Sequence, residues 1–485
     1  MSFEHKLCNE WTVKPLIECT EDRVISYGVV QPGKHDPNGL PIVRVNNITA
    51  NEFDLNNVMF ISKEIEEKFS RTRLVGGEVL LTLVGSTGQS MVVPKELSGW
   101  NVPRAIAVIR VKEDIGAEWI NLCLQTKEVF EYLDARANTT VQKTLNLKDV
   151  REIPILLPPR PIKSAIENVA LGISKKIQSN KKINKTLEQM AQALFKSWFV
   201  DFEPIKAKIE VLEAGGSQED ATFAAMTAIS GKDTDALVVF ERTYPEQYAE
   251  LKATAELFPA AMQDSELGEI PMGWNVLPLE SATSLIIDHR GKTPKKLGGD
   301  WSEDGYPAIS AKNIKNGRLV RHDAIKYVDP ELYKKWMRDV LLSGDILMTS
   351  EAPLGELLYL AKNSNYLLSQ RLYGIRADNN IVSGCYLYLW LQSTRAKDDI
   401  NGRATGSTVV GIRQSELKKV NVMAPKKDLI ESFSSLAAYY LAKIESNEKE
   451  NIVLENIRDT LIPKLLSGEI TLPEAEQAIS EVENV

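Results

Sequence analysis

Hydrophobic residues follow two different spacings along the chain, and segments of the two kinds alternate. Short apolar runs with a period near two stand between Gly, Pro and Asn residues, as in PIVRV, GEVLLTLVG and RAIAVIRV, and later in PAISA, GDILMT and RLYGIRA. Such runs, rich in β-branched residues, are typical of strands. Two longer apolar patterns, at residues 117–136 and 384–400, favour one helix within each strand-rich region.

The spacing changes to three and four residues in two segments that begin near Ile162 and Leu429. Apolar residues, Met190 and Leu436 among them, then recur on one helical face. This pattern predicts two long helices of about 40 residues, each on the order of 60 Å long. The spacing is close to a heptad seam, so the helices are expected to form a coiled coil.

The two halves of the chain repeat one another. Residues 179–188 read SNKKINKTLE, and residues 446–455, 267 positions later, read SNEKENIVLE. The match continues upstream with small drifts, from VREIPILLPP against LKKVNVMAPK to WTVKPL against WNVLPL. Loop insertions produce such drift, and repeats of this kind indicate duplicated structural units. One module is therefore predicted twice, from Trp11 to about residue 203 and from Trp274 to about residue 470.

Polar residues interrupt both predicted seams at equivalent places. A polar residue on a seam weakens packing but fixes register and partner. Equivalent asparagines would meet if the two helices packed antiparallel with their midpoints facing. The alternative is that these asparagines occupy exposed positions of a short, imperfect heptad. The predicted seam residues are Asn180, Asn184, Leu187, Asn447, Asn451 and Leu454.

Charge is distributed unevenly over the 485 residues, whose formal net charge is −8. Residues 205–270 hold 5 Lys and Arg against 13 Asp and Glu, which leaves 53 of the 58 basic and 53 of the 66 acidic residues for the remainder. The overall acidity therefore does not exclude nucleic-acid binding by the other segments. A neutral remainder is still a weak case for unaided phosphate binding, so a DNA role would need partner subunits to supply positive surface.

Cysteine usage and hydropathy favour the cytoplasm. The four cysteines lack CxxC spacing, so they are expected to be reduced and to bind no zinc. No apolar run approaches the ~18 residues of a membrane span. The first residues, MSFEHKLCNEW, lack the apolar core of a secretory signal.

The helical segments carry the most specific sequence. LEQMAQALFKSWFVDFEPIKAK follows the first decamer, DSELGEIPMGW opens the second module and LENIRDTLIPKLLSGEI closes it. With the two-module layout, this closely resembles the specificity subunit of type I restriction-modification systems over nearly the whole chain. The resemblance implies an α+β fold, with two mixed α/β target recognition domains joined by two long antiparallel coiled-coil helices in an internal pseudo-twofold repeat.

The resemblance also implies function and partners. Each recognition domain would read one half of a bipartite, asymmetric double-stranded DNA site, and the helices would set the unread gap. Two modification (methyltransferase) subunits would dock on the helices, and restriction (translocase and endonuclease) subunits would join them in phage defence. S-adenosylmethionine, ATP and Mg would be bound by these partners, so the chain would hold no cofactor or metal and would not be an enzyme.

On this basis the chain divides into six segments. They are target recognition domain 1 (1–158), the first spacer helix (159–204), an acidic helical insert or linker (205–271), target recognition domain 2 (272–424), the second spacer helix (425–470) and a C-terminal tail (471–485).

Polar loops at equivalent positions of the two modules offer side chains that can contact base edges or phosphates. The alternative for each loop is an ordinary polar turn, and Arg104 and Arg371 could equally be structural ion-pair partners. The DNA-binding candidates of the first module are Arg44, Asn46, Asn47, Thr87, Gln89, Arg104, Thr140, Gln142 and Lys143. Those of the second are Lys312, Asn313, Glu351, Arg371, Arg403, Ser407, Thr408 and Arg413.

The end of the first long helix is unusually aromatic. Phe195, Trp198, Phe199 and Phe202 fall within about two turns, more than one seam can bury. The excess predicts either a subunit interface or packing against a recognition domain.

Catalytic motifs are missing from the sequence. GSTGQ at residues 85–89 lacks the GK[ST] of a P-loop, and neither an NPPY-like methyltransferase motif nor a Gly-rich cofactor loop is present. The four histidines are unclustered. A recognition subunit fits this pattern. A helical adaptor with two non-DNA ligand-binding domains is the alternative, and a self-sufficient modification enzyme is disfavoured.

Overall fold

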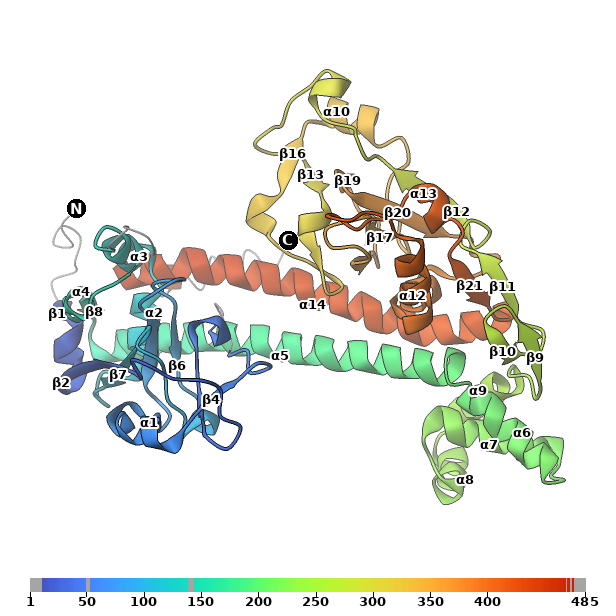
Figure 1. Cartoon of the computed structure of the whole chain (residues 1–485), viewed down its shortest axis with the longest axis horizontal. Coiled ribbons are helices and arrows are strands. Elements are labelled where there is room, and N and C mark those ends of the chain that lie inside the picture. The colour runs from blue at the N-terminus through green and yellow to red at the C-terminus, as the bar shows by residue number, and fades with distance from the viewer. Residues whose placement is uncertain (1–10, 49–52, 138–143, 468, 472, 475–485) are drawn as a thin grey trace. The chain divides into compact units, whose positions relative to one another are not determined.

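A computed structural model of the chain describes residues 11–48, 53–137, 144–467, 469–471 and 473–474 (Figure 1). The chain divides into two compact units, the first comprising residues 1–178 and 451–485 and the second residues 179–450. Each unit holds one strand-rich domain and a part of each of two long helices.

The first unit is built on a four-stranded antiparallel sheet in the order β2-β7-β5-β6. Two more antiparallel pairs join β1 to β8 and β3 to β4. The strands are β1 (Thr12–Pro15), β2 (Thr20–Tyr27), β3 (Leu40–Ile42), β4 (Met59–Ile61), β5 (Val79–Thr82), β6 (Ser90–Val92), β7 (Ile106–Val111) and β8 (Pro154–Leu157). The short helices are α1 (Lys63–Glu67), α2 (Ala117–Leu124), α3 (Lys127–Asp134) and α4 (Leu147–Arg151).

The second unit repeats this plan. Its four-stranded antiparallel sheet has the order β12-β20-β17-β18, and β11 pairs with β21 as β1 pairs with β8. The strands of this domain are β11 (Asn275–Pro278), β12 (Thr283–Asp288), β13 (Tyr306–Ile309), β14 (Ile314–Lys315), β15 (Arg318–Leu319), β16 (Lys326–Val328), β17 (Ile346–Thr349), β18 (Leu357–Tyr359), β19 (Leu367–Leu368), β20 (Leu372–Ala377) and β21 (Asn421–Ala424). Its helices are α10 (Pro330–Trp336), α11 (Gly384–Gln392), α12 (Thr394–Arg403) and α13 (Gln414–Leu417). The matching strand order confirms the predicted internal repeat.

Central strands of both sheets are buried on both faces, with the two-residue period of a strand. Val79 and Leu81 of β5 pack into a core with Trp119, whereas Leu80 between them packs into a separate core. This alternation follows from the pleat, which points successive side chains to opposite faces.

The sequence pattern predicts one helix at residues 117–136 and one at 384–400, but each region holds two short helices. Between α2 and α3, Thr126 caps the start of α3: its hydroxyl accepts a hydrogen bond from the amide of Val129. Ser393, 267 residues later, caps α12 in the same way. The pattern of apolar residues continues through both breaks, so the capping residues are the only local sign of them.

Two long helices, α5 (Arg160–Phe199) and α14 (Lys427–Ser467), contribute to both units. In the first unit, Ile166 of α5 joins the core that also holds Ile462 and Leu465 of α14. In the second unit, Phe195 of α5 meets Phe433 of α14, with ring centroids 5.9 Å apart. Residues early in one helix thus pair with residues late in the other, so the helices run antiparallel.

The aromatic end of α5 is core, which corrects the prediction of a subunit interface. Phe195, Trp198, Phe199 and Phe202 are all at most 4% exposed. They pack with residues of the second recognition domain and of α14, including Trp274, Tyr386 and Phe433. The second alternative, packing against a recognition domain, therefore accounts for the excess of aromatic residues.

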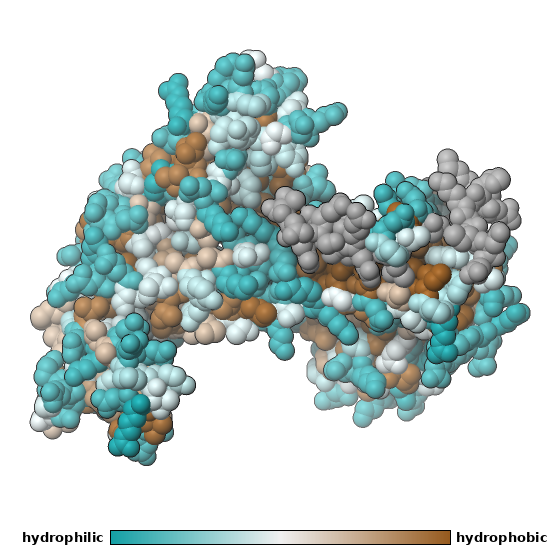
Figure 2. Space-filling model, turned by 180° about the vertical axis from the view of Figure 1, so that it is seen from behind, coloured by the Kyte–Doolittle hydropathy of each residue, from teal (hydrophilic) through white to brown (hydrophobic). Residues whose placement is uncertain are grey.

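Helices α6 (Glu203–Glu213), α7 (Gln218–Ser230), α8 (Thr234–Thr243) and α9 (Pro245–Glu256) form most of the acidic insert. Mostly hydrophilic side chains cover this lobe, at the lower left of Figure 2. Lys208 is buried, and its ammonium donates hydrogen bonds to the carbonyls of Ala255 and Phe258 at the end of α9. The predicted helical insert is not entirely helical, because β9 (Met262–Ser265) and β10 (Gly268–Pro271) form a hairpin.

Candidate nucleic-acid interface

A polar site lies where α5 and α14 pair within the second unit. The Nδ2 of Asn447 donates to the Oδ1 of Asn184 (2.7 Å), and the Nδ2 of Asn184 donates to Glu448 (2.7 Å). The Nδ2 of Asn180 donates to Glu450 (2.9 Å). Buried amides with specific partners fix one register, since any shift would leave them unpaired.

The predicted seam holds for its asparagines and less well for its apolar residues. Asn180, Asn184, Asn447 and Asn451 are at most 3% exposed, while Leu187 and Leu454 are half-buried. Ala191 and Ala437 are buried, and the neighbouring Met190 and Leu436 are exposed. Because each helix packs against a recognition domain as well as its partner helix, the buried face is broader than a coiled-coil seam.

The second recognition domain contacts this polar site. Arg318 of β15 lies 3.5 Å from Glu448 on α14. Burial raises the pKa of Glu188 on α5, which also faces Arg318 and Glu448. An ion pair therefore links the hairpin β14–β15 to the helix pair.

Two predicted DNA contacts are structural. Asn47 and Asn313 are buried, and each amide oxygen accepts the backbone amide of a residue three positions earlier. The Nδ2 of Asn47 donates to the carbonyl of Asp54, and that of Asn313 donates to the carbonyl of Val320. Both side chains hold a loop together and cannot reach a base edge, so the DNA-contact interpretation of these two residues is wrong.

Two predicted arginines are also engaged within the chain. The guanidinium of Arg44 donates to the carbonyl of Asn57 (2.9 Å). Arg403 pairs with Asp399 through its Nε (2.6 Å) and lies 4.0 Å from Glu416. These contacts favour structural roles over base contacts for both arginines.

A buried threonine that the sequence reading missed holds the GSTGQ loop of Thr87 and Gln89. The amide of Gln89 donates to the hydroxyl of Thr82 (3.0 Å), and in the second unit the amide of Glu356 donates to Thr349 (2.8 Å). Thr87 and Gln89 are half-buried. The signal available in the sequence was the repeat of Thr at this strand end in both modules.

The remaining candidates differ in accessibility. Glu351 is half-buried, and its carboxylate pairs with the Nε of Arg371 (2.9 Å). Arg371 has a φ of 64°, a conformation that costs energy for a residue with a Cβ and that clusters at functional sites. Thr140, Gln142 and Lys143 lie outside the described residues. The candidates with exposed side chains are Asn46, Arg104, Lys312, Arg371, Ser407, Thr408 and Arg413.

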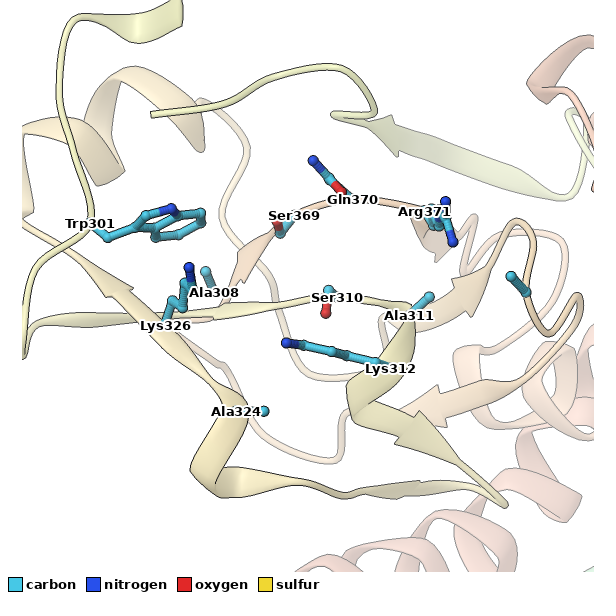
Figure 3. Close-up of a pocket in the computed structure, with 11 residues that line it drawn as sticks. Trp301, Ala308, Ser310, Ala311, Lys312, Ala324, Lys326, Ser369, Gln370 and Arg371 are labelled. Carbon is cyan, nitrogen blue, oxygen red and sulfur yellow. The ribbon is translucent and has the colours of Figure 1, made fainter. Parts of the chain in front are cut away.

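A cavity of about 410 Å³ in the second unit gathers two of these exposed candidates, Lys312 and Arg371 (Figure 3). Trp301 and Lys326, which sequence reasoning missed, stand at one end of the cavity, and Arg371 stands at the other. The ammonium of Lys326 lies 5.3 Å from the centre of the Trp301 ring.

Within the described ranges, His, Cys, Asp and Glu residues nowhere gather in a group that could hold a metal ion. In the same residues, every helix is too short or too polar to cross a membrane.

Comparisons with known proteins agree with this architecture. A family model described as the type I restriction modification DNA specificity domain matches residues 30–189 and again 271–456. The HindI specificity subunit of Haemophilus influenzae is 31% identical over 81% of this chain and 86% of that protein. The MjaIX specificity subunit of Methanocaldococcus jannaschii is 21% identical over 82% of this chain and 78% of that protein. A type-I restriction-modification S subunit structure from M. genitalium, at 13% identity, covers 96% of this chain and 99% of its own with a TM-score of 0.52, which shows a similar fold.

Proposed function

The chain belongs to the type I restriction modification DNA specificity family. We therefore propose that it recognises a bipartite, asymmetric DNA site and that each recognition domain reads one half of this site. One observation carries the proposal: the specificity domain occurs twice in one chain, once on each structural repeat. The helical-adaptor alternative gains no support from these similarities.

Differences between the repeats support an asymmetric site. The loop after β5 carries Thr87 and Gln89, whereas the equivalent loop after β17 carries Glu351 in an ion pair with Arg371. Amide and hydroxyl groups donate and accept, whereas a carboxylate accepts only. Two domains with different side chains at equivalent loops are expected to prefer different bases.

The chain acts in this proposal as a recognition and scaffolding subunit without chemistry of its own. Two modification subunits dock on the long helices and bind S-adenosylmethionine, and restriction subunits bind ATP and Mg for translocation and cleavage. The neutral charge of the chain outside its acidic insert supports this division, because partners must then supply part of the surface that contacts phosphates.

Methylation mapping tests the proposal. The full chain is co-expressed with a modification subunit with which it co-purifies, and long-read sequencing locates methylated bases in the DNA of the host cells. We expect one new motif with two defined halves around a fixed unread gap.

A strain that expresses the modification subunit alone is the control. Soluble, co-purifying proteins that produce no new split motif would contradict the proposal. Methyl transfer by the isolated chain would contradict the non-catalytic role.

A further inference from the structure

The cavity of Figure 3 has a lining that the equivalent region of the first repeat lacks. Hydrogen bonds and strand register identify the equivalent residues. The amide of Ser302 donates to the carbonyl of Tyr327, and in the first repeat the amide of Asp36 donates to the carbonyl of Phe60. Ala308 is the strand partner of Lys326, and in the first repeat Ile42 is the strand partner of Met59. The two pairs of strands therefore align, and Trp301, one residue before Ser302, corresponds to His35.

Space for a ligand comes from small side chains. Ala308, Ala311, Ala324, Ser310 and Ser369 line the cavity. In the first repeat the position of Ala308 holds Ile42, which is fully buried and packs with Met59. A volume of about 410 Å³ lies within the ~300–1,000 Å³ range of small-ligand sites.

Positive charge surrounds this space. Lys312, Lys326 and Arg371 line it, and no Asp or Glu is among its lining residues. Of the described carboxylates, none forms an ion pair with Lys312 or Lys326, whereas Arg371 pairs with Glu351. Lys312 and Lys326 therefore place positive charge in a concave site without a paired carboxylate, and such charge attracts an anion such as a phosphate.

An aromatic face completes the lining. Trp301 is 37% exposed, and its ring packs against that of the buried Trp336, with ring centroids 6.5 Å apart. A partly exposed indole offers a ring face on which a nucleobase can stack once the ammonium of Lys326 moves from over the ring to the phosphate. Lys326, which lies over this ring, would contact the phosphate of the same nucleotide.

We infer that this cavity binds a single nucleotide unit, with its base against Trp301 and its phosphate between Lys312 and Lys326. The nucleotide comes either from the bound DNA, in which case the inference rests on the proposed function, or from free nucleotides in solution. In DNA, the base must leave the helical stack to reach the indole. Recognition of the second half-site, the one read by the second recognition domain, would therefore be sensitive to local unpairing.

The test uses the full chain in complex with its modification subunit. Affinity is measured for duplexes with both half-sites intact and with the second half-site scrambled. Trp301→Ala is expected to weaken binding of the intact duplex by roughly 5- to 150-fold, the cost of one lost base stack. It should weaken binding of the scrambled duplex far less, because without the specific contacts of the second half-site no base is placed in the cavity.

Three variants serve as matched controls. Trp301→Phe keeps an aromatic face and should restore most of the affinity. His35→Ala alters the equivalent position of the first repeat and should leave the second half-site unaffected. Lys326→Met introduces the residue type of Met59 and should reduce the salt dependence of binding. Thermal unfolding identifies any variant that fails to fold.

A second measurement separates the two sources. The four deoxynucleoside monophosphates are titrated against the complex while tryptophan fluorescence is recorded. Quenching that Trp301→Ala abolishes, with duplex affinity unchanged, would assign the site to free nucleotides. A duplex effect without quenching would assign it to DNA.

Folded Trp301→Ala and Trp301→Phe complexes that match the wild type in both measurements would overturn the inference. Failure of the proposed function looks different: the wild-type complex itself would not distinguish the intact duplex from the scrambled one.

Discussion

Single residues show how a repeated polar position can have a structural cause. Asn47 and Asn313 occupy equivalent places because each closes the same loop through its buried amide. A polar residue repeated at equivalent positions therefore indicates a role in the fold that the two domains share. Readers of different half-sites must instead differ, as Trp301 and His35 do.

Replacing Asn47 should affect stability and not specificity. Asn47→Ala removes hydrogen bonds to three backbone groups inside a loop, and we expect a loss of about 1–3 kcal/mol in the free energy of unfolding. Asn46→Ala, at the exposed neighbouring position, is the control and should unfold as the wild type does. Urea denaturation measures both, and equal stability of the two variants would contradict the structural role.

Glu66 should make the first unit sensitive to acid. Its buried carboxylate accepts hydrogen bonds from Arg73 and Asn101, and the bond from Arg73 lowers the pKa of Glu66 below its ordinary value of 4.5. A carboxyl with a lowered folded-state pKa contributes stability above its unfolded pKa and loses it as the pH falls through the folded pKa.

Glu66→Gln should therefore cost about 1–3 kcal/mol near neutral pH, and the difference from the wild type should shrink below pH 4.5. Urea denaturation between pH 7 and pH 3 measures this difference. Glu64→Gln, on the same short helix and exposed, is the control. A difference that stayed constant with pH would show that the charge of Glu66 is unimportant.

For helices and strands, the periodicity of apolar residues predicted the features that depend on neighbouring residues in the sequence. The two long helices and the strand-rich domains could be read from spacing and repetition, whereas the antiparallel pairing of the helices was implied by the family resemblance. The buried aromatic residues from Phe195 to Phe202 could not, because their partners Trp274 and Phe433 lie far away in the sequence. For the same reason, Trp301 and Lys326 showed no local signal: they meet only through strand pairing.

The amide contact between α5 and α14 should be energetically coupled. Asn184→Ala and Asn447→Ala each remove one partner of a buried 2.7 Å hydrogen bond, so each should cost about 1–3 kcal/mol. The double variant should cost less than the two costs together, with a coupling of about 0.5–3 kcal/mol. Thermal or urea unfolding of the wild type, the two single variants and the double variant measures this coupling. Lys185→Ala, at an exposed position, is the control. Strict additivity would show that the two amides act independently.

At the scale of the whole molecule, the helix pair is expected to determine the gap between half-sites. Deleting residues 171–177 from α5 and 454–460 from α14 removes one heptad from each and preserves the buried face. The helices shorten by about 10 Å, so the unread gap should shrink by about 3 base pairs while both half-sites stay the same.

Methylation mapping reads this outcome directly. Deleting the heptad from α5 alone is the control, and it should abolish methylation because the helices no longer match in length. Altered half-site sequences after the double deletion would contradict a spacing role.

The division of the chain into units also determines the order in which they can be completed during synthesis. The second unit is contiguous, but the first needs Ile462 and Leu465 to fill the core around Trp119 and Ile166. At ~5–20 residues per second, those side chains leave the ribosome on the order of 15–60 s after residue 178. The domain that is translated first is therefore the last to be finished, and a nascent chain released early would keep an open apolar core at its amino-terminal end.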